Sequence, residues 1–227
     1  MLATIVNALV VVLGGLLGTA LGNRLNPERT KTLIAGLGIC TVVIGIPGAI
    51  ATSNILIVIG SIALGTIGGE LLKIETGLDI AGDWLKAKVA KNGGSRFTEG
   101  FVTASLLFCV GSMAVMGSFD AGLRGNYDTI FAKSALDCVM AVTFGATMGI
   151  GVVFSALTIF LYQGALTLLA GVIEPLLTAE IITEMTAVGG IMLIATGLNI
   201  LQLPKERIRV GNMLPALIFP ALWFLLF

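Results

Sequence analysis

Long apolar runs alternate with short polar segments along the whole chain. Eight of these runs approach the length of a transmembrane helix, which needs about 20 apolar residues to cross the hydrocarbon core. They are residues 2–22, 31–51, 54–72, 97–118, 129–149, 152–173, 183–203 and 211–227. The pattern predicts an all-α, polytopic membrane protein in which residues 1–227 form a single transmembrane domain.

One polar stretch between the third and fourth runs has a different pattern. Leu78, Ala81, Trp84 and Leu85 recur at helical spacing within residues 74–93, and charged residues lie between them. This is typical of an amphipathic helix that lies at the membrane interface. We expect it to anchor the protein at the cytoplasmic surface, and the alternative is that it binds a regulatory partner.

The boundary between the fifth and sixth runs is the weakest division. Residues 148–151 contain glycines and no charge, so a turn there must be very tight, and without it the chain has seven spans. Eight spans fit the basic residues better, because eleven of the thirteen then fall on one side. These are Arg24, Arg29, Lys31, Lys73, Lys86, Lys88, Lys91, Arg96, Lys205, Arg207 and Arg209. The positive-inside rule makes that side cytoplasmic and places both termini outside the cytoplasm.

Composition supports a membrane protein and excludes several chemistries. Only 11% of the residues are charged, against about 25% in soluble domains, and the mean hydropathy is +1.03. The net charge of zero gives no reason to expect a nucleic-acid partner. The chain has no His and no hydrolase or phosphate-loop motif, and Cys40, Cys109 and Cys138 lie in apolar runs without metal-ligand spacing. We therefore expect no enzyme activity, no metal and no cofactor.

Three of the apolar runs carry small residues at every fourth position, which places them on one helix face. Such Gly-xxx-Gly faces let two helix backbones approach closely in lipid. The stripes are Gly14, Gly18 and Gly22; Ser61, Gly65 and Gly69; and Ala141, Gly145 and Gly149. They predict helix packing within the chain or between two copies of it.

The runs also show signs of internal repetition. Asn7, Asn54 and Ser134 each precede a stripe glycine by eleven residues, about three helical turns. The runs that contain Cys40, Cys109 and Met192 share a second pattern, which suggests a helix pair used about three times. The third occurrence of this helix pair, which begins with the run that contains Met192, is either an inverted copy or a chance resemblance. Many transporter folds are built from such repeats, but a duplicated packing module would look the same.

The third stripe continues backward to Asp137 and then Lys133, a pair four residues apart inside a predicted span. Ionisable residues at that depth are costly and are candidates for functional sites. As a structural pair, they would hold neighbouring helices in register. As a functional pair, they would bind a cation or take up a proton.

Other polar or glycine-bearing positions are candidates for lining a pathway. Residues 44–48 contain Pro47, and residues 110–118 contain Gly111, Ser112, Gly117 and Ser118, so we expect irregular backbone at both places. Asp120 lies at the predicted outer mouth, and Gln163 lies inside the sixth run. The repeated residues Asn7 and Asn54 would line or brace the cavity, whereas Glu174 and Glu184, at the outer boundary, are expected to be exposed to water.

Several longer motifs resemble a known family. Residues 111–118 (Gly-Ser-Met-Ala-Val-Met-Gly-Ser), 132–137 (Ala-Lys-Ser-Ala-Leu-Asp) and 161–164 (Leu-Tyr-Gln-Gly) are similar to signature sequences of domain-of-unknown-function family 554, as are residues 209–215. The resemblance covers essentially the whole chain. It implies a multi-pass protein of a bacterial inner membrane, often labelled a candidate transport protein, with no established substrate. Ser112 departs from the family, which usually has Pro there, and this weakens the expected helix break.

Together, these features predict a transporter or channel for a small solute or ion in the bacterial inner membrane. The lipid bilayer and the transported solute or ion are the expected partners, and a second copy of the chain is a further candidate. The alternative is a structural or sensory membrane protein that uses its glycine stripes for packing or homodimerisation and transports nothing.

Overall fold

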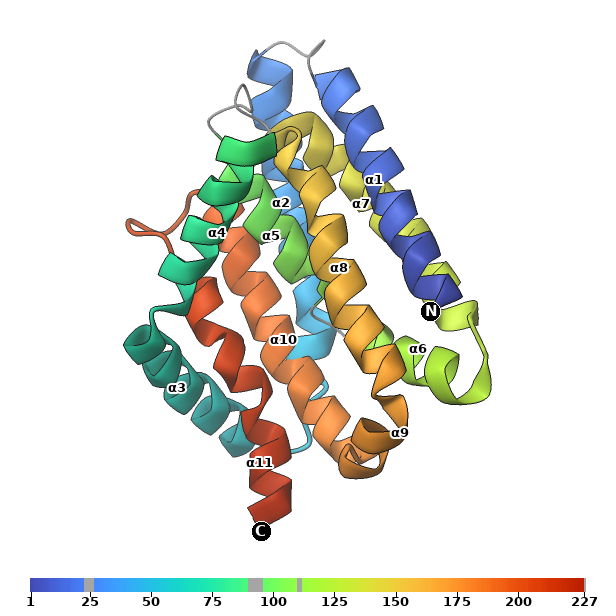
Figure 1. Ribbon diagram of the computed structural model, residues 1–227. Helices are drawn as coiled ribbons and strands as arrows, with labels where there is room; N and C mark the ends of the chain where they lie inside the picture. The colour runs from blue at the N-terminus through green and yellow to red at the C-terminus, as the bar shows by residue number, and fades with distance from the viewer. Residues whose placement is uncertain (23–26, 90–95, 110–111, 227) are drawn as a thin grey trace. The chain divides into compact units, whose positions relative to one another are not determined.

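The computed structural model describes residues 1–22, 27–89, 96–109 and 112–226, and throughout these ranges the regular structure is helical (Figure 1). Six of the described helices are long and apolar enough to span a membrane. They are α1 (Leu2–Gly22), α2 (Pro27–Ile50), α3 (Ile55–Leu72), α7 (Asp128–Met148), α8 (Gly151–Leu168) and α10 (Ala179–Ile200). This confirms the all-helical class and the presence of several candidate membrane helices.

The two remaining predicted spans have less regular structure. The fourth consists of α5 (Phe97–Cys109) and α6 (Ser112–Phe119), which continues into the π-helical turn η1 (Asp120–Arg124), and the two parts are bent by 58°. The eighth consists of a 3-10 segment, η3 (Val210–Leu217), followed by α11 (Phe219–Leu226). The number of eight spans therefore stays a prediction.

The chain divides into two compact units. The first comprises residues 1–34, 79–109 and 113–173, which include α1, α5, α7, α8, α9 (Ala170–Ile173) and most of α6. The second comprises residues 35–78, 110–112 and 174–227, which include most of α2, α3, η2 (Glu174–Leu176), α10, η3 and α11. The helix α4 (Ile74–Val89), which corresponds to the predicted amphipathic segment 74–93, contributes residues to both units; residues 90–93 lie outside the described residues.

The first unit is built on a close, parallel pair of helices, α1 and α7 (Figure 1). A Cβ added at Gly14 would lie 2.9 Å from the carbonyl oxygen of Cys138, and one added at Gly18 or Gly22 would overlap a carbonyl oxygen of α7. On the α7 side, Gly145 faces the backbone of Gly15. The first and third stripes therefore face each other, and the absence of side chains at these glycines lets the two backbones touch.

A tight turn at Gly149 separates α7 from α8. Gly149 has a φ of 82°, a left-handed value that glycine adopts without steric cost. The next helix begins at Gly151, where an added Cβ would overlap the carbonyl oxygen of Phe97 on α5. The fifth and sixth predicted spans are thus two helices, and the glycines allow both the reversal and the close approach of α5.

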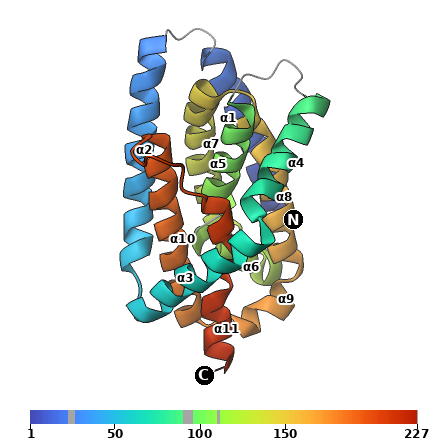
Figure 2. The same ribbon diagram turned by 90° about the vertical axis from the view of Figure 1, so that its left-hand side faces the viewer.

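The second unit contains two further close pairs. Gly45 and Gly48 of α2 lie against Gly190 of α10, and these two helices run antiparallel (Figure 2). The second stripe faces η3, where a Cβ at Gly65 would overlap backbone atoms of Ala216 and one at Gly69 would overlap the carbonyl oxygen of Asn212. Small residues again allow backbone contact.

The expectation of irregular backbone is wrong at residues 44–48, whereas the run that contains residues 110–118 is broken into α5 and α6, which are bent by 58°. The helix α2 continues through Pro47 to Ile50, because Pro47 removes only one backbone donor in the last turn and the antiparallel packing on α10 holds that turn. The segment 112–119 is helical, and the Ser118 hydroxyl donates to the carbonyl of Ala114 at 2.6 Å within it. Residues 110 and 111 lie outside the described residues.

Candidate functional site

A buried ion pair lies on α7 where the third stripe ends. Lys133 Nζ contacts Asp137 Oδ2, and the two residues are only 6% and 7% exposed. Their spacing of four residues places both side chains on the face that packs inside the first unit. Asp137 lies nine residues after Asp128, about 14 Å along the helix axis at 1.5 Å per residue, so the carboxylate is well inside the predicted span.

Two amide side chains from other helices complete this site. Asn7 of α1 donates through Nδ2 to Asp137 Oδ2 at 3.1 Å and to Gln163 Oε1 of α8 at 3.2 Å. Both amides are fully buried, at 0% exposure. The ring of Phe108 on α5 lies 5.9 Å from Lys133 Nζ. We call Asn7, Lys133, Asp137 and Gln163 the polar cluster; it joins three candidate membrane helices.

The hydrogen bonds fix the orientation of both amides. The carboxylate oxygen of Asp137 only accepts, so Asn7 must present its nitrogen there. The same nitrogen faces Gln163, which must therefore present its oxygen. This leaves Asn7 Oδ1 and Gln163 Nε2 buried without a hydrogen-bond partner among the described residues. Each buried polar atom without a hydrogen-bond partner costs about 1–3 kcal/mol, so the presence of two such atoms in one cluster needs an explanation.

A second polar contact lies about one turn from the cluster, toward the N-terminus of α1 and the C-terminus of α8. The hydroxyls of Thr4 and Thr167 are 3.4 Å apart and both residues are buried. Thr4 precedes Asn7 by three residues, and Thr167 follows Gln163 by four, so both continue the faces that carry the amides. A line of polar side chains therefore leads from the cluster toward this end of the two helices.

The other sequence-predicted pathway residues lie elsewhere. Asp120 forms a partly exposed ion pair with Arg124 at 2.5 Å. Gly117 packs against Ile130, and the hydroxyl of Ser118 is bonded within its own helix. Gly111 and the side chain of Ser112 lie outside the described residues.

The three polar residues that define the predicted repeat have three different surroundings. Asn7 belongs to the polar cluster, whereas Ser134 donates to the carbonyl of Ile130 within α7 at 2.7 Å. Asn54 lies in the second unit, where its side chain caps α3 by accepting from the amide of Leu56 at 3.1 Å. A common spacing from a glycine thus does not give these residues a common role.

The expectation that Glu184 is exposed to water is wrong, because only 1% of it is exposed. Its carboxylate accepts from the Thr52 hydroxyl at 2.5 Å and from the backbone amides of Ser53 and Asn54 at 2.8 and 3.1 Å. These amides lie at the N-terminus of α3, where unpaired donors and the helix dipole favour an anion. The Glu174 side chain lies outside the described residues.

Sequence reasoning also missed the buried carboxylate of Glu75, in the first turn of α4. It accepts from the amide of Gly211 at 2.5 Å, while Asn212 accepts from the amide of Glu75 at 2.7 Å. This reciprocal contact joins the starts of α4 and η3. The Glu at the second position of α4 was a usable signal, since acidic residues are favoured in a first turn.

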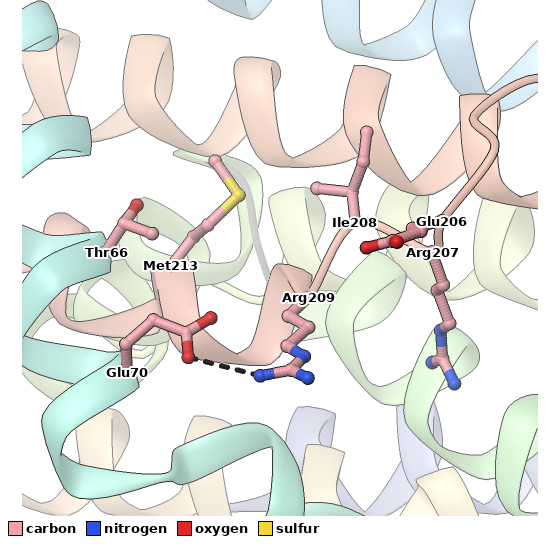
Figure 3. Close-up of a pocket in the computed structure, with 7 residues that line it drawn as sticks. All are labelled: Thr66, Glu70, Glu206, Arg207, Ile208, Arg209 and Met213. Atoms are coloured by element: carbon pink, nitrogen blue, oxygen red, sulfur yellow. Dashed lines mark hydrogen bonds and ion pairs between the residues drawn. The ribbon is translucent and has the colours of Figure 1, made fainter.

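A surface pocket of about 460 Å³ lies near this contact in the second unit. Its lining is Thr66, Glu70, Glu206, Arg207, Ile208, Arg209 and Met213 (Figure 3). Arg209 and Glu70 form an ion pair of 3.3 Å across it, and Arg207 lies 3.4 Å from Glu75. The charges of this pocket largely neutralise one another, so we treat the polar cluster as the stronger candidate site.

Apolar helices of membrane-spanning length and a buried polar cluster that joins three of them define a polytopic α-helical membrane protein. The chain belongs to the family described as "Protein of unknown function (DUF554)", whose sequence model matches residues 2–225. It is 30% identical over 226 residues to the "Uncharacterized membrane protein YdfK" of Bacillus subtilis (strain 168). The matched residues cover 97% of this chain and 94% of that protein.

A second relative is the "Uncharacterized protein YqgA" of Escherichia coli (strain K12). It is 32% identical over 218 residues, which cover 94% of this chain and 92% of that protein. No solved structure matches the chain. The family predicted from the motifs is thus confirmed, and the relatives' names give no substrate or activity.

Proposed function

We propose that this protein is a transporter or channel for a small solute or ion, with its pathway beside α7. The observation that carries the proposal is the polar cluster, which places two charged and two amide side chains, with two unsatisfied polar atoms, among candidate membrane helices. Burying such groups is costly in a protein that only needs to pack. Asp137 is the proposed ion or proton site, and Lys133 competes with the ion for its carboxylate.

The proposed location is the bacterial inner membrane, with eight spans and both termini outside the cytoplasm. Helix directions within the first unit support this topology. The contacts of Asn7 with Asp137 and of Gly18 with Val142 make α1 and α7 parallel, while Asn7 and Gln163 belong to antiparallel helices. An eight-span arrangement requires both relations, whichever side of the membrane the N-terminus lies on.

The predicted internal repeats also belong to this proposal. The close pairs α1–α7, α2–α10 and α3–η3 all rest on small residues, and they are compatible with a duplicated helix pair. Helices related in this way often enclose a solute site near the midplane. The segment 74–93 would lie along the cytoplasmic interface and anchor the bundle.

Contacts of the stripes weigh against the alternative of a structural or sensory protein that dimerises through them. The stripe glycines Gly18, Gly69 and Gly145 already touch other helices of the same chain. A second copy cannot use these faces without separating those helices. Homo-oligomers through other surfaces stay compatible with the proposal.

The test is ion flux into proteoliposomes that contain the purified protein. The probes are a proton gradient read by an internal pH dye and, separately, gradients of Na⁺ and K⁺. We expect flux above that of protein-free vesicles, and we expect Asp137→Asn to abolish it. The variant should remain folded, because Lys133 lies near a helix end and its side chain can extend toward water.

The control is Thr158→Val, which removes a polar side chain of α8 that contacts Ser105 at 3.0 Å, away from the cluster. It should retain flux. If Asp137→Asn unfolds the protein, the double variant Lys133→Met/Asp137→Asn, which leaves no unpaired charge, takes its place. Full flux in a folded Asp137 variant would refute the proposed role of this carboxylate.

A further inference from the structure

Unsatisfied atoms in the polar cluster carry information about what binds there. Asn7 Oδ1 is an acceptor and Gln163 Nε2 is a donor, and both residues are completely buried. Their orientation is fixed by Asp137, as derived above, so turning an amide over would place two like groups in contact. A molecule that satisfies both atoms must itself donate one hydrogen bond and accept another.

The charge of the cluster limits the class of molecule further. Lys133 and Asp137 carry opposite charges and contact each other, so the cluster is neutral as a whole. A bound ion would add an uncompensated charge to a desolvated site, which is much more costly than burying a neutral polar group that is hydrogen-bonded. The vacant donor and acceptor therefore fit an uncharged group better than an ion.

Thr4 and Thr167 extend this chemistry toward one end of α1 and α8. Each threonine hydroxyl can both donate and accept a hydrogen bond. The uncharged ligand group that would satisfy Asn7 and Gln163 must do the same. A hydroxyl or carboxamide group can thus exchange hydrogen bonds with the threonines before it reaches the amides.

We infer that Asn7 Oδ1 and Gln163 Nε2 bind a small uncharged solute through its hydroxyl or carboxamide group, which arrives past Thr4 and Thr167. This inference rests on the proposed transport function and names its substrate class. The Lys133–Asp137 pair holds Asn7 in position.

The experiment is stopped-flow light scattering of proteoliposomes exposed to gradients of glycerol or urea. These probes carry hydroxyl and carboxamide groups, respectively, and sodium chloride serves as the charged comparison. We expect the protein to accelerate entry of at least one uncharged probe over protein-free vesicles. Gln163→Met should reduce this entry by about 10- to 100-fold, which corresponds to about 1.4–2.8 kcal/mol.

Two further variants make the result specific. Asn7→Leu should cause a similar loss, and Thr158→Val, on the same helix as Gln163, should leave entry unchanged. If Gln163→Met does not insert, Thr4→Val provides the second test, with a reduced rate of entry expected. Folding of each variant is checked by size-exclusion chromatography and circular dichroism in detergent.

Each outcome decides between the two proposals. Flux of ions alone, without entry of glycerol or urea, overturns this inference and leaves the transport function standing. Entry of an uncharged probe that Gln163→Met and Asn7→Leu do not change overturns it as well, since the amides then hold only a fixed water. Absence of all flux, of ions and uncharged probes, overturns the transport function and this inference together.

Discussion

Replacing Gly18 by alanine should destabilise the protein although alanine is the better helix former. The added Cβ would overlap the carbonyl oxygen of Val142 and lie 2.8 Å from its carbonyl carbon and 2.9 Å from the amide nitrogen of Ala146. All three are backbone atoms of α7, so no side-chain rotation relieves the contact and α1 must shift. Overpacking of this kind costs about 1–3 kcal/mol, and the gain in helix propensity offsets about 0.5–1 kcal/mol.

The matched control is Gly164→Ala, in α8 of the same unit. The nearest atom to its added Cβ is the flexible end of Met1, at an ordinary 3.5 Å. This variant keeps the propensity gain without the overlap, so the two substitutions should change stability in opposite directions. The assay is reversible unfolding in mixed micelles with increasing sodium dodecyl sulfate, followed by circular dichroism. Equal stability of Gly18→Ala and Gly164→Ala would refute the backbone contact between α1 and α7.

Three other predictions use the same assay. Lys133→Met should lower the free energy of unfolding by about 3–5 kcal/mol, because it leaves a buried carboxylate without its cation. Adding Asp137→Asn should recover most of that loss. If the effects of the two substitutions simply add, the pairing is contradicted. Glu184→Ala should lower stability more than Glu184→Gln, since only the amide still accepts from the start of α3, and the reverse order would exclude this capping role. Arg96 donates two hydrogen bonds to Glu99, of 2.8 and 2.9 Å, and they raise the pKa of the Arg96 guanidinium. Arg96→Ala should therefore lower the free energy of unfolding by about 0.5–1.5 kcal/mol. An unchanged stability would mean that this partly exposed pair contributes nothing.

Much of the architecture could be predicted from periodicity and glycine spacing. Apolar runs of membrane length gave the candidate membrane helices, because burial in lipid demands continuous apolar sequence. The stripe at Gly145 pointed to the helix face that carries Asp137, since a fourfold spacing continues along one face. The sequence could not show that Asn7 and Gln163 join that carboxylate, because contacts 130 and 156 residues from Asn7 depend on helix packing.

Errors arose where a local rule was overruled by packing. Residues 44–48 were expected to have irregular backbone because of Pro47, but contacts of Gly45 and Gly48 with α10 hold this last turn of α2 in a helix. Glu184 was assigned to water by its position near a predicted helix end. Its actual partners are the backbone amides of residues 53 and 54, and no pattern of side chains reveals amide donors that become available only when α3 begins beside α10.

Water access to the polar cluster tests the central claim most directly. The measurement uses a chain in which Cys40, Cys109 and Cys138 are replaced by serine or alanine, and a single cysteine is placed at Gln163. Gln163→Cys keeps the Lys133–Asp137 pair intact. Intact cells and inverted vesicles are then treated with a membrane-impermeant thiol reagent.

The comparison is Leu161→Cys, two residues away at nearly the same depth of α8 but on its exposed apolar face. The proposed pathway predicts that the cysteine at 163 reacts from at least one side of the membrane while the cysteine at 161 does not. Absence of reaction at position 163 from both sides, in a correctly inserted protein, would contradict a pathway and make the cluster a dry packing element.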